Sequence, residues 1–178
     1  MNRVMQVVCF SLIMLPLHIL PLQAQTLRRG IDTLQLGGSL EEVQTQLQRS
    51  PYFFYRGPRD VSFLPQREET LIDTEGVRYI QRGIFQFQEG KLVSLMLYLN
   101  PKYLDYPTVF KHLISRYGQP HYLDPKSCYW MDEQTRIALE KPLTVKFVDR
   151  KILASNAERS SLEIAPEEVA RRTFLELF

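Results

Sequence analysis

The sequence predicts an α+β fold: an antiparallel β-sheet with helices packed on one face, arranged as two tandem helix–sheet units, plus a C-terminal helix. Two stretches, 40–49 and about 107–117, carry apolar residues at helical spacing. Each is followed by apolar segments separated by polar turns, the pattern of antiparallel strands. The order of elements therefore repeats once, and neither half is expected to bury its own helix unaided.

Residues 1–24 have the pattern of a secretory signal peptide. One basic residue precedes an apolar run without acids, and the small Ala24 stands directly before the polar Gln25. We expect cleavage between Ala24 and Gln25 and a periplasmic or secreted location. An uncleaved N-terminal membrane anchor is the alternative, although two prolines interrupt the run. In that case the leader would be the chain's membrane contact.

Composition restricts the class of the mature protein. Removal of the leader from 178 residues leaves 154, enough for one domain with a genuine core. The mature chain has 21 basic and 20 acidic residues, so a nucleic-acid partner has little support. Of the two cysteines, Cys9 leaves with the leader and Cys128 remains alone, which excludes an internal disulfide.

The first helix–sheet unit is expected at 34–101, after a polar lead-in at 25–33. Ser39 and Glu42 have capping-box spacing, which predicts a helix over 40–49. Shorter strands are expected at 61–64 and 69–73. The strongest strand signal is a hairpin within 77–99, with a turn at 88–91 that contains Gly90.

Two further features of that hairpin are predicted. Gly83 lies inside the first strand, where an isolated glycine indicates a β-bulge. The second strand, 92–99, is apolar on both faces, which predicts a central strand covered on both sides.

The second helix–sheet unit is expected at 102–153. Pro107 suits the first turn of a helix that Gly118 and Pro120 end. Strands are expected at 128–131 and 136–139, around a turn at 132–135, and again near 144–147.

The last segment, 154–178, is expected to be a linker followed by an amphipathic helix from Pro166. Its apolar residues are Val169, Phe174, Leu177 and Phe178.

Three segments carry a family resemblance. Gly37–Val43, Phe85–Leu92 and Leu113–Pro120, together with Trp130, resemble positions of the BamE-like superfamily of exported bacterial proteins. That superfamily takes in the small outer-membrane lipoprotein of the β-barrel assembly machinery and tandem-repeat proteins related to the β-lactamase inhibitor protein. The resemblance covers most of 34–153. It implies a helix pair packed on one face of an antiparallel sheet, and a role in protein–protein contact.

No catalytic, cofactor or metal constellation is predicted. Cys128, His121 and Asp124 are close in sequence, but the aromatic neighbours of the thiol favour burial over activation. The two histidines left in the mature chain match no zinc spacing. Acid pairs suit helix starts and turns, and a hydrolase using Asp132 and Glu140 remains an alternative function.

Aromatic residues are the one feature that points to binding. Large aromatics with polar tips concentrate in interface hot spots, although many of those here are expected to belong to the core. The candidate binding-face aromatics are Tyr52, Phe54, Tyr55, Tyr103, Tyr106 and Trp130.

The sequence therefore predicts an exported, non-enzymatic protein of the cell envelope that acts as a protein–protein interaction module, with an envelope protein as its partner. Alternatives are the small envelope hydrolase above and a carrier that holds an apolar ligand against its sheet.

Overall fold

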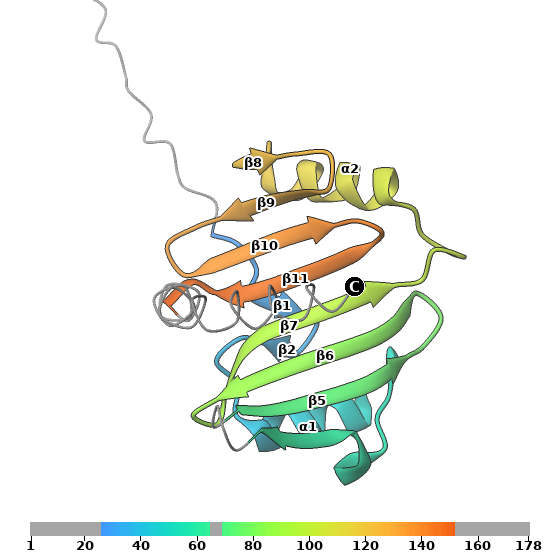
Figure 1. Cartoon of the computed structure of the whole chain (residues 1–178), viewed down its shortest axis with the longest axis vertical. Helices are drawn as coiled ribbons and strands as arrows, with labels where there is room; N and C mark the ends of the chain where they lie inside the picture. Colours follow the sequence, from blue (N-terminus) through green and yellow to red (C-terminus); the bar gives the residue numbers. More distant parts are fainter. Residues whose placement is uncertain (1–25, 65–68, 152–178) are drawn as a thin grey trace, which may run out of the picture.

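The computed structural model describes residues 26–64 and 69–151 (Figure 1). Within these residues, nine strands form one antiparallel sheet in the order β3-β5-β6-β7-β11-β10-β9-β8, with β4 also paired to β5. The strands β1 and β2 form a separate small hairpin. The elements are β1 (Gly30–Ile31), β2 (Leu34–Gln35), α1 (Leu40–Arg49), β3 (Phe53–Phe54), the 3₁₀ helix η1 (Gly57–Asp60), β4 (Val61–Leu64), β5 (Glu69–Gly76), β6 (Ile80–Gln88), β7 (Lys91–Leu99), α2 (Tyr106–Tyr117), β8 (Tyr122–Leu123), β9 (Ser127–Met131), β10 (Thr135–Glu140) and β11 (Thr144–Asp149).

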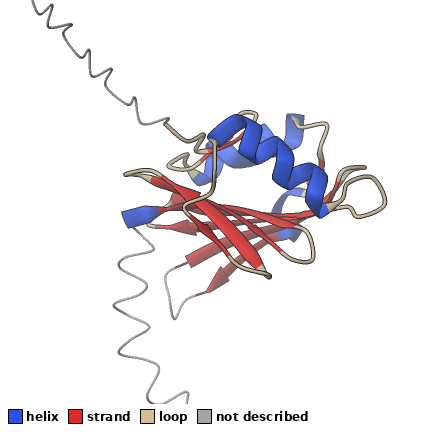
Figure 2. Ribbon diagram, turned by 90° about the horizontal axis from the view of Figure 1, so that it is seen from above, coloured by secondary structure: helices blue, strands red, loops and turns tan. Residues whose placement is uncertain are grey.

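The predicted α+β class is wrong, because the chain folds as a mainly β protein around a single large sheet. The strand content was underestimated: β5 extends to Gly76, and the short strands β3 and β8 were not predicted. The two described α-helices lie on one side of the sheet (Figure 2), but α2 contributes only Leu113 as a fully buried side chain. The C-terminal helix of that prediction lies outside the described residues.

The expected tandem units are not separate sheets. The last strand of each half, β7 and β11, pair with each other from Thr144 opposite Tyr98 to Val148 opposite Ser94. Each of these strands would otherwise expose a row of unpaired N–H and C=O groups at an edge. Their pairing makes both halves one continuous sheet, with β7 and β11 at its centre.

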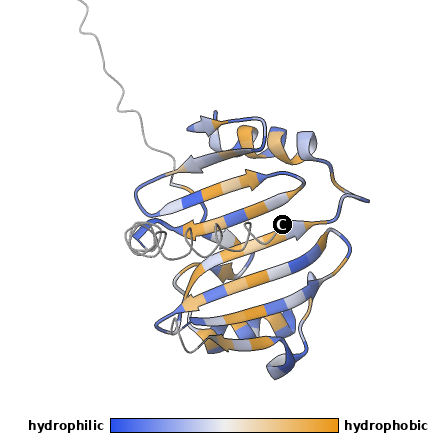
Figure 3. Ribbon diagram, viewed as in Figure 1, coloured by the Kyte–Doolittle hydropathy of each residue, from blue (hydrophilic) through white to orange (hydrophobic). Residues whose placement is uncertain are grey.

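The hydrophobic core occupies the face of the sheet that the helices cover. Phe85, Leu95, Phe147, Ile137 and Trp130 are paired in register across five neighbouring strands, and all are buried. From the helix side, Val43 and Leu47 of α1 complete this cluster. Apolar and polar residues alternate along several strands, as the hydropathy colours show (Figure 3), and successive side chains of a strand point to opposite faces of the sheet.

The prediction of a helix over 40–49 is confirmed. Ser39 Oγ accepts a hydrogen bond from the Glu42 N–H at 3.2 Å, and Glu42 Oε2 accepts one from the Ser39 N–H at 2.7 Å. The start of this helix is also tied to the sheet, because the Gly37 N–H donates to the Leu92 carbonyl at 2.7 Å. The second predicted helix is confirmed as α2, with Asp105 as its N-cap and Gly118 at its end.

The predicted hairpin is confirmed as β6 and β7, but the bulge expected at Gly83 is not there. The register shifts of this pair fall between Ile80 and Arg82 and between Gln86 and Phe87. At Gly83, a Cβ atom would lie 2.5 Å from the Phe53 ring. The glycine therefore makes room for an aromatic ring from β3 that packs edge-on against Phe85.

The lead-in predicted as merely polar is part of the folded body. Leu27 is buried, and its N–H donates to Asp132 Oδ2 at 2.7 Å. Arg29 forms an ion pair of 2.7 Å with Asp149 at the end of β11. These contacts hold the first described residues against the β9–β10 turn and β11.

Two groups of predictions lie outside the described residues. The first is the leader with its cleavage site at Ala24 and Gln25, and the second is the segment 154–178 with its linker and amphipathic helix. Within 26–64 and 69–151, no helix is both long enough and apolar enough to cross a membrane.

Candidate binding surface at one end of the sheet

Four loops meet at one end of the sheet. They are the residues before β3, the β5–β6 turn, the β7–α2 connection and the β10–β11 turn, which the antiparallel register brings to the same edge. Four exposed side chains stand on the first three of these loops, and we call them the aromatic end: Tyr52, Val77, Tyr79 and Tyr103, exposed by 42, 42, 40 and 47%.

Hydrogen bonds and ring contacts hold the aromatic end together. The rings of Tyr79 and Tyr103 pack edge-to-face with centroids 5.9 Å apart. Asn100 fixes the loops below them, because its N–H donates to the Tyr79 carbonyl at 2.8 Å and its side-chain amide donates to the Arg78 carbonyl at 2.9 Å. The Val77 N–H donates to the Tyr52 carbonyl at 2.8 Å. The tyrosines are therefore displayed by ordered backbone.

Three cations surround these aromatics. The Arg78 guanidinium lies 4.8 Å from the centre of the Tyr79 ring, and the Lys102 ammonium lies 5.7 Å from that of Tyr103. The Lys141 ammonium, on the β10–β11 turn, lies 5.6 Å from the Tyr106 ring. Within the described part of the chain, none of the three forms an ion pair. The rim of the aromatic end therefore carries three cations, with the exposed carboxylate of Asp105 beside them in the β7–α2 connection.

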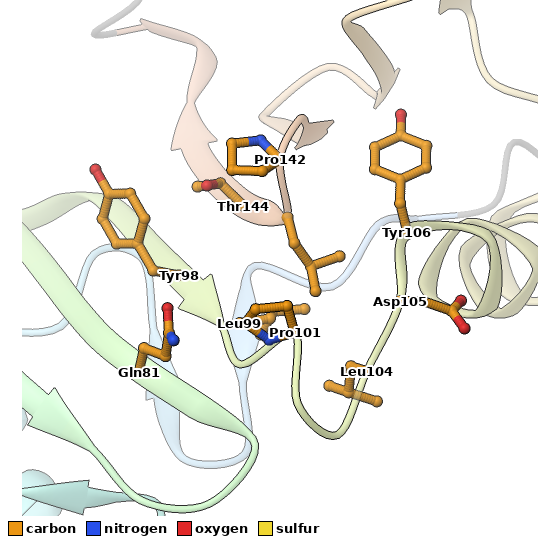
Figure 4. A pocket seen from close by; sticks show the side chains of 10 residues that line it. Gln81, Tyr98, Leu99, Pro101, Leu104, Asp105, Tyr106, Pro142 and Thr144 are labelled. Atoms are coloured by element: carbon orange, nitrogen blue, oxygen red, sulfur yellow. The ribbon is translucent and has the colours of Figure 1, made fainter.

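An apolar cavity of about 270 Å³ opens beside this rim. Tyr98 and Thr144 lie on one side of it, and Leu104 and Tyr106, which lead into α2, lie on the other (Figure 4). Pro142 of the β10–β11 turn is also part of its wall. Pockets for drug-sized ligands are usually larger, about 300–1,000 Å³, so this volume suits an apolar side chain or two.

Tyr106 joins this cavity to the core. Its hydroxyl lies 3.7 Å from Cys128 Sγ and donates to the Leu139 carbonyl at 3.4 Å. Burial raises the pKa of the Tyr106 hydroxyl well above its usual value. Burial likewise raises the pKa of the Cys128 thiol. Both groups are therefore neutral near pH 7 and act as structural parts of the wall.

The predicted binding-face aromatics divide into three groups. Tyr52 and Tyr103 belong to the aromatic end, and Phe54 is 63% exposed on the neighbouring β3. Tyr106 lines the cavity, and Tyr55 packs half-buried against the core. Trp130 is fully buried, with its indole N–H donating to the Gly118 carbonyl at 2.8 Å.

Sequence reasoning missed the other half of the aromatic end. Val77 and Tyr79 were assigned to a predicted hairpin strand, and Arg78, Lys102 and Lys141 were not singled out. The one available signal was the short stretch before the hairpin, where Arg78 stands directly before Tyr79.

The candidate catalytic groups are not brought together. Asp132 lies before β10 and Glu140 at its far end, where Glu140 pairs with Lys146 at 2.7 Å. Burial acts to raise the pKa of Asp132, but hydrogen bonds from the N–H groups of Leu27, Gln134 and Thr135 keep it below the usual value. Both acids therefore serve the fold in this arrangement.

His121 and the remaining metal-binding residue types show no ligand set either. Among the residues that the structure describes, no group of three or more His, Cys, Asp or Glu side chains could hold a metal ion. His121 Nδ1 accepts a hydrogen bond from the Met131 N–H at 3.3 Å, which ties it to β9.

A second, polar cavity of about 370 Å³ lies over β5 and β6 near η1. Four of its six charged side chains are paired, Arg56 with Asp60 at 2.8 Å and Arg82 with Asp73, and Arg59 and Glu75 complete the charged lining. A bound ion would have to compete with these internal partners, so the apolar cavity and the aromatic end make the better candidate site.

Comparison with known proteins gives a family for this fold. Residues 29–159 match the family model described as TP0088 domain, about three quarters of the chain. The chain belongs to the TP0088 domain family. The match includes every described strand and helix, so the aromatic end and its cavity lie within the TP0088 domain. The family description names no enzymatic activity.

No curated protein and no solved structure matches the chain.

Proposed function

We propose that this TP0088 domain is a non-enzymatic protein–protein interaction module of the cell envelope, and that it holds its partner at the aromatic end. The observation that carries the proposal is the pair Tyr79 and Tyr103, exposed on ordered loops beside an apolar cavity. Exposed tyrosines next to a pocket that can receive a partner's side chain are typical of interface hot spots.

The rim defines the chemistry of the partner. Arg78, Lys102 and Lys141 place three positive charges around an apolar centre. Opposite charges at a rim steer association and select among partners more than they add affinity. The partner should therefore present one or two apolar side chains flanked by acidic residues.

The location rests on the sequence. Residues 1–24 have the order of charge, apolar run and small residue that export machinery reads, and the BamE-like resemblance is to exported proteins. We therefore place the partner in the envelope. The hydrolase and carrier alternatives have less support, because the two candidate acids lie at opposite ends of β10 and the apolar cavity is small.

One preparation tests location and binding together. The protein is purified from an envelope fraction, its N-terminus is sequenced, and the mature chain is used to isolate its partner. We expect Gln25 as the first residue and one partner in near-stoichiometric yield. The double variant Tyr79→Ala, Tyr103→Ala should raise the dissociation constant roughly 30-fold or more, as expected for two hot-spot truncations.

Phe63→Ala is the matched control. Phe63 is 61% exposed, but its partner in the register is Thr70, at the opposite end of β5 from the aromatic end. It should bind as the wild type does. Equal binding by the double variant and the wild type, or recovery of no stoichiometric partner, would overturn the proposal, and an intact leader on cytosolic protein would overturn the location.

A further inference from the structure

The face of the sheet turned away from α1 and α2, which we call the open face, carries four apolar side chains that we call the apolar band, with Gln86 and Ser94 between two of them in the register. Leu71 on β5, Ile84 on β6, Met96 on β7 and Val148 on β11 point to this face, and Ile84 and Met96 are direct neighbours in the register. All four are half-buried, and none belongs to the hydrophobic core cluster. Both described helices lie on the other side (Figure 2).

Paired charges flank this band. Asp73 and Arg82 form one ion pair on the β5–β6 side, and Glu140 and Lys146 form another on the β10–β11 side. Each carboxylate is thus matched within the face, which leaves the strip between them without net charge. Such a strip fits an amphipathic element whose apolar stripe lies along the band and whose polar sides meet the charges.

The chain itself leaves the sheet beside this band. β11 ends at Asp149, next to β7 in the middle of the sheet, and 27 residues follow Lys151. Those from Pro166 onward carry the stripe predicted from the sequence, Val169, Phe174, Leu177 and Phe178. As a helix, 166–178 would be about 20 Å long, and the four strands of the band span roughly 14 Å between their axes.

We infer that the C-terminal segment 166–178 docks on the open face of its own chain, with its apolar stripe on Leu71, Ile84, Met96 and Val148. Residues 152–165 provide the connection. Attachment at the centre of the sheet gives the segment a high effective concentration over the band, about millimolar for a short linker. The segment then covers the second face of β7, and the aromatic end stays free.

Thiol protection in the full mature chain tests this inference. Met96→Cys places a reporter in the band, and its rate of maleimide labelling is compared between the natural C-terminal segment and the variant Phe174→Asp, Leu177→Asp. We expect labelling to be at least roughly tenfold faster in the variant. This is the ratio of labelling rates if the natural segment is undocked for no more than about a tenth of the time. Ile84→Cys gives a second reporter on the adjacent strand.

Two controls make the result specific. Arg172→Asp makes the same change of two charge units on the other side of the predicted helix and should leave the protection intact. Lys111→Cys, exposed on α2, should label equally fast with every C-terminal sequence. Equal labelling of both band reporters with natural and altered segments would overturn the inference. Protection that disappears on dilution would also overturn it, because it would identify a second copy as the cover.

Discussion

Among single residues, Asp60 is the buried charge on which the fold most visibly depends. It is 3% exposed, and its carboxylate accepts hydrogen bonds from the Arg56 N–H at 3.0 Å and from Arg56 Nε at 2.8 Å. Burial acts to raise the pKa of Asp60, but the hydrogen bonds and charge of Arg56 outweigh it, so the pKa lies below its usual value. Ionised Asp60 therefore stabilises the folded state.

Asp60→Asn tests this at the residue scale. At neutral pH the variant should lose about 1–3 kcal/mol of unfolding free energy, the range for a broken buried hydrogen-bond pair. Because the pKa of Asp60 is lowered in the folded state, its ionisation stabilises the fold at pH values above the unfolded-state pKa of about 4. This stabilisation is lost as the pH falls through the folded-state pKa. The gap between variant and wild type in urea unfolding should therefore shrink below about pH 4.

Asp32→Asn is the control for this experiment. Asp32 is exposed in the β1–β2 turn with φ +47°, a conformation that asparagine tolerates equally well. It should match the wild type at every pH. A gap for Asp60→Asn that stays constant into the acid range would show that its charge does not carry the effect.

At the scale of elements, α1 shows how a local signal and a sheet contact reinforce each other. The capping box satisfies N–H groups that the first turn leaves without helical partners. The same turn is bound to β7 through Gly37 and Gly38, whose backbone groups pair with Leu92 at 2.7 and 2.8 Å. The helix start is therefore fixed from both sides.

Ser39→Ala should accordingly destabilise the protein by about 1 kcal/mol, the usual cost of an N-cap serine replaced by alanine. Ser115→Ala is the matched control, because Ser115 is exposed within α2, where alanine is favoured. Urea unfolding of the two variants checks both values. A Ser39→Ala variant as stable as Ser115→Ala would show that the sheet contacts alone hold the start of α1.

At the scale of the whole molecule, the pairing of β7 with β11 makes the two halves interdependent. Each half has a helix and a run of antiparallel strands, yet the centre of the sheet belongs to both. Leu95 and Leu97 of the first half pack beside Phe147 and Val145 of the second, and all four are buried. Neither half can unfold without exposing the core of the other.

We therefore expect a single cooperative unfolding transition. Trp130, the one tryptophan of the chain, lies in the core of the second half. Its fluorescence should change at the same urea concentration at which the amides of β6, in the first half, lose their protection from hydrogen exchange. If the midpoints of the fluorescence change and of the loss of amide protection differed by more than experimental error, the two halves of the sheet would not unfold as one unit.

Prediction from sequence succeeded where the deciding forces are local. The capping box at Ser39 and the glycine turn of the β6–β7 hairpin act within a few residues, so their patterns are readable along the chain. Gly83 was misread because its reason lies in another strand: it accommodates Phe53. Trp130 was assigned to a binding face although its indole partner, the Gly118 carbonyl, holds it in the core.

By itself, the sequence determined the helix over 40–49 and the hairpin of the first half. Hydrophobic spacing and turn chemistry are enough for these, because they act over short stretches. Only the tertiary structure decided that the strands form one sheet in a mainly β fold, and that Tyr79 meets Tyr103 beside a cavity. Strand pairing and contacts between surface loops bring together residues far apart in the chain, and no local pattern specifies which distant segments will meet.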